Sequence, residues 1–168
     1  MKTLRIFSFI TLLIIPPLLV SAQKSTSIDK VTSAYLGVKD ALAAGNGTVA
    51  ESKAKELFDA LSAGPAKGLS PDQQKLFNSY ADKLKYDSRH ISETTGVEHQ
   101  REHFANLSKN LYEVLKGLKM NTATIYEEYC PMKNAYWLSE SSAIKNPYYS
   151  DKIMNTCGKV SATLPGAK

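Results

Sequence analysis

The sequence predicts a mainly α-helical protein: an antiparallel four-helix bundle with a small C-terminal β/loop subdomain. Between residues 28 and 118, apolar side chains recur every three or four positions in four stretches of similar length, the pattern of amphipathic helices. Short connections separate these stretches, which favours antiparallel neighbours. After Lys119 this pattern gives way to aromatic and β-branched residues, which favour strands.

The first 22 residues are predicted to be a signal peptide. Lys2 and Arg5 form a positive start, residues 6–20 are mostly apolar, and small residues follow up to Ala22, as signal peptidase requires. The alternative is a retained membrane anchor. Pro16 and Pro17 argue against it, because they interrupt an apolar segment already shorter than the roughly 20 residues needed to span a bilayer. We therefore expect an exported protein with no membrane span after cleavage.

Cleavage would leave 146 of the 168 residues, enough to form one domain with a sizeable core. We divide it into a helical bundle, residues 23–120, and a Cys/Met-containing C-terminal subdomain, residues 121–168, packed on the bundle. Of the 21 basic residues, 19 remain against 16 acidic ones. This excess is too small and too interspersed to indicate nucleic acid binding.

The first two helices are expected over about residues 28–44 and 48–64. The apolar stripe of the first consists of Ile28, Val31, Tyr35, Val38 and Leu42. The sequence Gly45-Asn46-Gly47 ends this helix. Thr48 and Glu51 then have the spacing of a capping box, in which a hydroxyl and a carboxylate each accept a hydrogen bond from a free backbone amide. The second helix is therefore predicted to begin at Thr48.

The third and fourth helices flank a break at residues 94–96. Ser70, Pro71 and Gln73 form a strong helix start, with an N-cap serine, a proline in the first turn and a capping-box glutamine. The fourth helix is expected to run to about Gly117. Gln100 lies near the centre of its apolar face, and a buried amide needs polar partners. We expect Gln100 to anchor the C-terminal segment.

The C-terminal segment is predicted to contain two short strands. Residues 122–129 are rich in β-formers, and residues 136–138 could form a second strand. Asn146 and Pro147 indicate a turn, because proline disfavours helix at the residue before it.

Four sulfur-containing side chains make this segment the place where metal chemistry is expected. Cys130 is followed closely by Met132, and Met154 closely precedes Cys157. Thiolate and thioether sulfur are soft ligands that select Cu(I) over cations preferring oxygen. If the two pairs face each other, they form a four-sulfur site. The alternatives to Cu(I) are Ag(I), or Zn(II) held by the cysteines and histidines.

Three further residues are candidates for this site. His99 and His103 are four apart on the fourth helix and share a face. His103 falls at the edge of the buried stripe and is the better candidate ligand; His99 is expected to face solvent. Trp137 is a candidate lid that would exclude water and oxidants from the metal.

The alternative for the two cysteines is a structural disulfide between Cys130 and Cys157, the ordinary fate of a cysteine pair in an oxidising compartment. The protein would then be a disulfide-stabilised interaction module of the cell envelope with no metal site. An enzymatic function is not expected, because no nucleophile, base and orienting group occur at a recognisable spacing. The Cys-x-x-Cys motif of thiol–disulfide oxidoreductases is also missing.

Several short strings resemble an uncharacterised domain family of Gram-negative envelope proteins: residues 100–104, 129–132, 135–139, 144–149 and 154–158. That family occurs as small exported proteins and as an additional C-terminal domain on periplasmic adaptor subunits of copper and heavy-metal efflux pumps. The resemblance implies a periplasmic protein that buffers copper or delivers it to an efflux system. It also implies an adaptor, or another component of such a system, as the partner. At the level of residues it carries over to Cys130, Met132, Met154 and Cys157.

Overall fold

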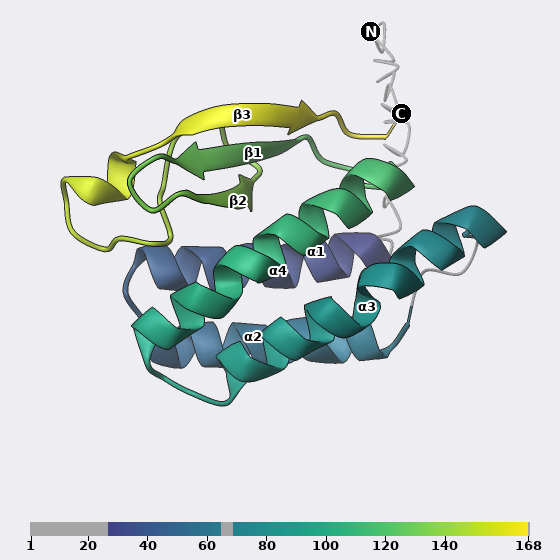
Figure 1. Ribbon diagram of the computed structural model, residues 1–168, viewed down its shortest axis with the longest axis horizontal. Helices are drawn as coiled ribbons and strands as arrows, with labels where there is room; N and C mark the ends of the chain where they lie inside the picture. Colours follow the sequence, from purple (N-terminus) through teal and green to yellow (C-terminus); the bar gives the residue numbers. More distant parts are fainter. Residues whose placement is uncertain (1–26, 65–68, 168) are drawn as a thin grey trace, which may run out of the picture.

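A computed structural model describes residues 27–64 and 69–167 of the chain, so the predicted signal peptide lies outside the described residues. Four helices precede three strands, with one 3-10 turn (Figure 1). The elements are α1 (Ser27–Ala43), α2 (Gly47–Ser62), α3 (Pro71–Ser92), α4 (Val97–Leu118), β1 (Ile125–Cys130), β2 (Ala135–Ser139), η1 (Met154–Thr156) and β3 (Lys159–Leu164). None of the described helices is long and apolar enough to cross a membrane.

Consecutive helices pack against one another, α1 on α2, α2 on α3 and α3 on α4. The sheet lies over α1 and α4 on one side of the helical layer (Figure 1), with β2 as the strand in contact with both helices. Buried side chains from every helix and from the first two strands belong to one apolar cluster, which includes Leu57, Leu107 and Trp137. The C-terminal segment therefore shares the core of the helices.

The helix starts at Ser70 and at residue 97 are confirmed, whereas the predicted capping box at Thr48 is wrong. Ser70 and Gln73 form the reciprocal capping box. At α2 the N-cap is Asn46, whose side-chain oxygen accepts a hydrogen bond of 3.0 Å from the amide of Val49. The helix begins at Gly47 because Asn46 already satisfies a free amide of the first turn. Only glycine fits there, since a Cβ at Gly47 would collide with the carbonyl oxygen of Thr95.

The sheet is antiparallel, with strand order β2-β1-β3. The two predicted strands are present with shifted ends, and the third strand was not predicted. Most of β3 is exposed along the edge of the sheet, so it lacks the apolar alternation that identifies a half-buried strand. The predicted turn at Pro147 is also present.

Two buried polar side chains of α4 organise the connections around the core. The Gln100 amide donates hydrogen bonds to the carbonyl oxygens of Gly47, Ile91 and Thr94. Gln100 thus joins the start of α2 to the α3–α4 turn, and the expectation that it anchors the C-terminal segment is wrong. Arg101 has that role: its guanidinium donates to the carbonyl oxygens of Leu42 and Pro147.

Candidate metal centres

The cysteine thiols lie side by side. Cys130 is the last residue of β1 and Cys157 directly follows η1, and their Sγ atoms are 3.5 Å apart. Both are free thiols; Cys130 is buried and Cys157 is partly exposed. The chain thus brings together two thiols that are 27 residues apart in the sequence, and one of them is partly exposed to solvent.

Asn146 holds the segment that carries Cys157. This side chain is fully buried. Its Nδ2 donates to the carbonyl oxygen of Cys157 at 2.7 Å, and its Oδ1 accepts from the amide of Tyr148 at 2.9 Å. The backbone amide of Asn146 also donates to the carbonyl oxygen of Asn155 at 2.7 Å. One residue therefore fixes both sides of the loop that places Cys157 against Cys130.

The two thiols differ in their tendency to ionise. Burial disfavours the Cys130 thiolate, but hydrogen bonds from the Lys133 amide and the Cys157 thiol outweigh it and lower the pKa of Cys130. The hydrogen bond to Cys130, followed by desolvation, raises the pKa of Cys157. Cys130 is therefore the more readily ionised thiol of the pair, and Cys157 the less readily ionised one.

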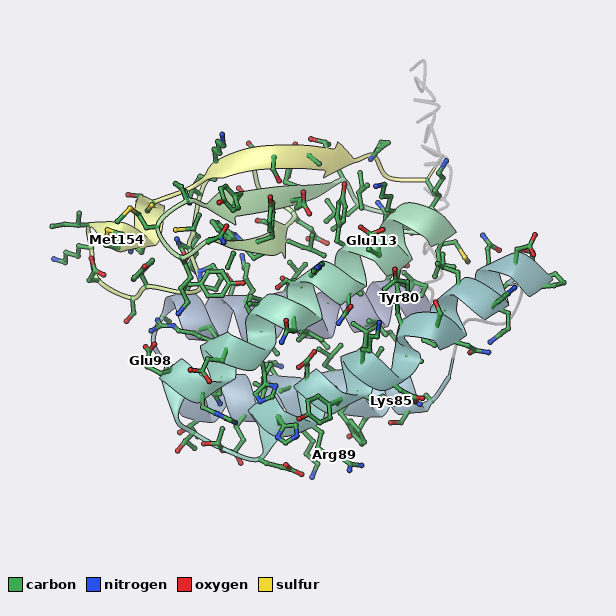
Figure 2. All side chains as sticks on the ribbon, in the orientation of Figure 1. Tyr80, Lys85, Arg89, Glu98, Glu113 and Met154 are labelled. Carbon is green, nitrogen blue, oxygen red and sulfur yellow. The ribbon has the colours of Figure 1, made fainter. Side chains whose placement is uncertain are left out.

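The two methionines lie in the segments that carry the cysteines. Met132 is in the β1–β2 connection and its side chain is 70 % exposed. Met154 begins η1 and is half-buried at the end of the sheet layer (Figure 2). The side chain of Asp151 accepts from the amides of Ile153 and Met154 and so fixes the start of this turn. The amide of Cys157 donates back to the carbonyl oxygen of Met154.

Trp137 lies beneath this segment. Its indole is fully buried, and the tip of the ring is so close to Gly158 that a Cβ at Gly158 would collide with it. The ring also meets Tyr148 edge-on, with centroids 6.1 Å apart. Trp137 therefore packs from the core against Gly158, the residue that follows Cys157.

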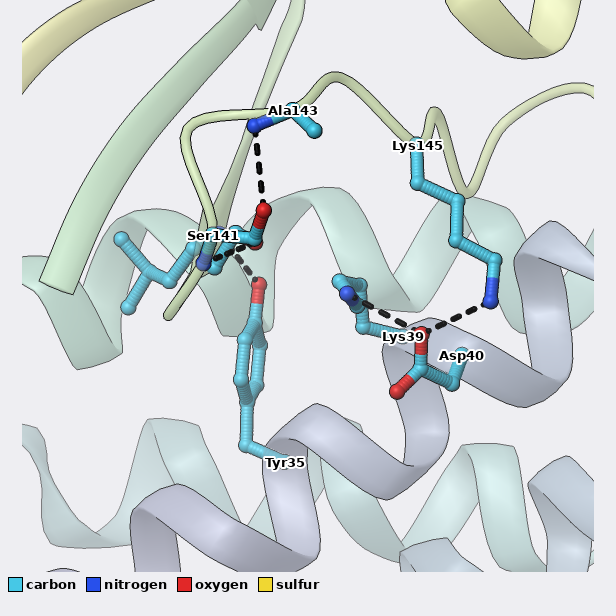
Figure 3. Close-up of polar contacts among 8 residues, drawn as sticks. Tyr35, Lys39, Asp40, Ser141, Ala143 and Lys145 are labelled. Atoms are coloured by element: carbon cyan, nitrogen blue, oxygen red, sulfur yellow. Dashed lines mark hydrogen bonds and ion pairs between the residues drawn. The ribbon is translucent and has the colours of Figure 1, made fainter.

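A charged contact ties the same loop to α1. Asp40 lies between Lys39 and Lys145, with Oδ1 3.1 Å from each ammonium nitrogen (Figure 3). Partial burial opposes ionisation of Asp40, but these two lysines prevail and lower its pKa. Together with the bond from Arg101 to Pro147, this contact secures the loop before it reaches Cys157.

His99 and His103 lie together, and they lie with His90 of α3. The ring centroid of His103 is 4.6 Å from that of His90 and 4.8 Å from that of His99. His103 Nδ1 is 3.0 Å from Oδ1 of the buried Asp87. His103 was the better histidine candidate for the sulfur site in the C-terminal subdomain. Its side chain instead lies against α3.

The histidines and the cysteine pair form two separate groups. In Figure 2, Met154 lies at the end of the sheet, whereas Arg89, the residue before His90, lies on the far side of the helices. His90 was not a predicted site residue. A signal exists in the sequence, because Asp87 and His103 lie eight residues on either side of Thr95, while His90 and His99 lie five and four residues from it. A helical hairpin centred on this turn brings such positions together.

A protein-family model described as "Protein of unknown function (DUF3347)" matches residues 31–123 of the chain. No curated protein matches, and no solved structure matches. The matched segment contains the three histidines and ends before Cys130, so the cysteine pair lies beyond it.

Proposed function

The chain belongs to the DUF3347 family of unknown function, and we propose that it is a binding protein for the soft ion Cu(I), not an enzyme. The observation that carries this proposal is the pair of free thiols with sulfur atoms 3.5 Å apart. An ion about 2.3 Å from each sulfur, the length of a zinc–thiolate bond, fits between sulfurs at this separation. Two thiolates favour a soft ion over Mg²⁺ or Ca²⁺.

Further ligands of this site are the thioethers of Met132 and Met154. Each sits within three residues of a cysteine, and the exposed Met132 is free to turn toward an ion held by the thiols. A thioether is neutral and needs no deprotonation, so it adds a soft ligand without adding charge. The site then offers two, three or four sulfurs, all of the class that Cu(I) accepts.

Accessibility favours buffering or delivery over permanent storage. Cys157 is partly exposed, and the neighbouring Ile153 and Met132 are 81 % and 70 % exposed. Exposed apolar side chains beside a metal site provide a surface for a partner that receives the ion. We propose that the protein works in the periplasm after signal-peptide cleavage, with an adaptor or another component of a copper efflux system as that partner. The helices, as an antiparallel four-helix bundle, serve as its scaffold.

An anaerobic competition titration tests this proposal. The reduced protein is titrated with Cu(I) against a chromophoric chelator, beside the Cys130→Ser/Cys157→Ser variant. We expect the protein to withdraw one equivalent of copper. We expect the variant to lose more than about 100-fold in Cu(I) affinity, because removal of a supporting residue alone typically costs about 10- to 100-fold. Equal affinities of the two proteins would contradict the site, and Lys152→Ala, an exposed change in the same loop, serves as the control that keeps Cu(I) affinity.

The same thiol distance supports a second candidate, a structural disulfide in an interaction module. Oxidation of the pair would close a loop and stabilise the fold by about 3 kcal/mol. Reaction of the air-exposed protein with a thiol-specific reagent separates the two. Two reactive thiols favour the metal site. The interaction module is favoured if no thiol reacts and if the reduced protein then binds Cu(I) no more tightly than the Cys130→Ser/Cys157→Ser variant.

A further inference from the structure

The α3–α4 hairpin carries a group of three imidazoles. His90 comes from α3, and His99 and His103 come from α4. One nitrogen atom from each ring lies within 4.8 Å of the other two. Nitrogen atoms bound to one ion at the usual distance of about 2.0–2.1 Å are about 3.3 Å apart in tetrahedral geometry. The rings of His90 and His103 are stacked with an interplanar angle of 6°, so binding of a common ion requires the rings to rotate as the three nitrogens close in from up to 4.8 Å.

Asp87 sets the orientation of His103. The Asp87 side chain is 6 % exposed, and its Oδ1 lies 3.0 Å from His103 Nδ1. An imidazole that donates from Nδ1 to a carboxylate presents a bare Nε2 on its other side. This arrangement of carboxylate and histidine recurs behind protein-bound metal ions, where it fixes the tautomer and raises the basicity of the ligand. The carboxylate also supplies negative charge beside the position of a cation.

Two neighbouring side chains restrict the other rings. Tyr86 packs against His90 with centroids 4.3 Å apart, and against His103 at 5.8 Å. The Glu102 carboxylate lies 3.9 Å from Nδ1 of His99, which leaves Nε2 of His99 as the free nitrogen. The His99 side chain is 51 % exposed, so an ion reaches the group directly from solvent.

We infer that His90, His99 and His103 form a second metal site, which takes a borderline divalent ion of the Zn²⁺ or Cu²⁺ class. Three imidazoles leave a fourth position open to water or to another ligand. Nitrogen ligands favour these ions over the harder Mg²⁺ and Ca²⁺. The inference is independent of the proposed Cu(I) site, because it uses none of the sulfur atoms.

The two faces of α4 support this independence. His103 faces α3, whereas the adjacent Phe104 faces Tyr35 and Tyr148, with ring centroids 5.0 and 6.0 Å away. Adjacent residues of a helix point about 100° apart. The histidines therefore occupy one side of α4, and the core beneath the C-terminal segment occupies another.

The test uses the Cys130→Ser/Cys157→Ser variant, so that no thiolate contributes to the signal. Co²⁺ is added as a spectroscopic probe, and Zn²⁺ affinity is measured by competition with a chelating dye. We expect one equivalent of Co²⁺ to give the visible absorption of a four-coordinate site without a sulfur charge-transfer band. Each of His90→Gln, His99→Gln and His103→Gln in this background should lower Zn²⁺ affinity at least tenfold.

Two controls separate ligation from a general loss of structure. Lys85→Gln, on the same helix α3 (Figure 2), should leave Zn²⁺ affinity unchanged, and the thermal unfolding of each metal-free variant reports on its fold. Asp87→Asn should lower affinity about tenfold through the orientation of His103. The inference is overturned if the cysteine-free variant binds neither ion, or if the three histidine substitutions leave Zn²⁺ affinity unchanged. A failed Cu(I) titration alone would contradict only the proposed function.

Discussion

At the scale of single residues, Asn146 connects the fold to the sulfur pair. Its side chain is buried and bonded on both ends, to the carbonyl oxygen of Cys157 and to the amide of Tyr148. A buried amide of this kind resists replacement, because each lost bond leaves a buried backbone group without a partner. The distance between the two cysteines therefore depends on a residue that is not itself a ligand.

Asn146→Ala is expected to destabilise the protein by about 1–3 kcal/mol for each buried partner left unsatisfied. The free energy of unfolding from urea denaturation measures this loss. Cu(I) affinity of the folded variant should also fall, because Cys157 loses its fixed position. Lys152→Ala, an exposed change in the same loop, is the control. A variant as stable as the unaltered protein would show that Asn146 does not hold the loop.

The sequence was informative about the cysteines and less so about their surroundings. Four sulfurs in two tight pairs pointed to the C-terminal segment, and the two thiols do lie together. The supporting role of Asn146 depends on contacts across the loop, which no local spacing reports. Trp137 was predicted as a lid that excludes water and oxidants from the metal; its ring is fully buried and lies against Gly158, the residue after Cys157.

At the scale of helices and strands, the start of α2 shows why local patterns are ambiguous. Both Asn46 and Thr48 are residue types that cap helices, and only Thr48 has a carboxylate three residues later. Asn46 is the cap, and Gly47 directly after it packs so closely against Thr95 that no side chain fits there. Tertiary contact thus selects between two sequence signals of similar strength.

A paired substitution tests this assignment. Asn46→Ala should lower the free energy of unfolding by about 1 kcal/mol, because the Val49 amide loses its acceptor. Thr48→Ala, at an exposed position within the first turn, should change it by less than about 0.5 kcal/mol. Chemical denaturation of both variants gives the comparison. The reverse order of effects would restore Thr48 as the cap.

The helices were more predictable than the sheet for a physical reason. Each helix carries its own apolar stripe and its own end signals, as Ser70 and Gln73 illustrate. Strand β3 is defined by hydrogen bonds to β1 and buries little of its own surface. The histidine group has a similar origin, because it exists only once α3 and α4 are folded back on each other.

At the scale of the whole molecule, Glu128 links stability to pH. It lies on β1 opposite Trp137 and is fully buried. Burial raises its pKa from 4.5 to about 7. The folded state therefore holds the proton more tightly than the unfolded state. The stability that the protonated Glu128 carboxyl adds to the folded state is fully present below pH 4.5 and is lost as pH rises through about 7.

Glu128→Gln should remove this dependence in the metal-free protein. The unaltered protein is expected to lose up to about 3 kcal/mol between about pH 4.5 and pH 8, whereas the variant keeps its stability over that range. Urea denaturation at a series of pH values provides the measurement, with the exposed Glu140→Gln as control. A flat profile for the unaltered protein would show that Glu128 is not held protonated by burial.

The central claim, that Cys130 and Cys157 bind Cu(I) as a pair, is tested most directly by X-ray absorption at the copper edge. The reduced protein is loaded with one equivalent of Cu(I) under anaerobic conditions, and the neighbours of the ion are identified by element. We predict that sulfur atoms alone surround the copper, and that these neighbours disappear in the Cys130→Ser/Cys157→Ser variant. Copper surrounded by nitrogen in the unaltered protein would contradict the account and move its metal chemistry to the histidines.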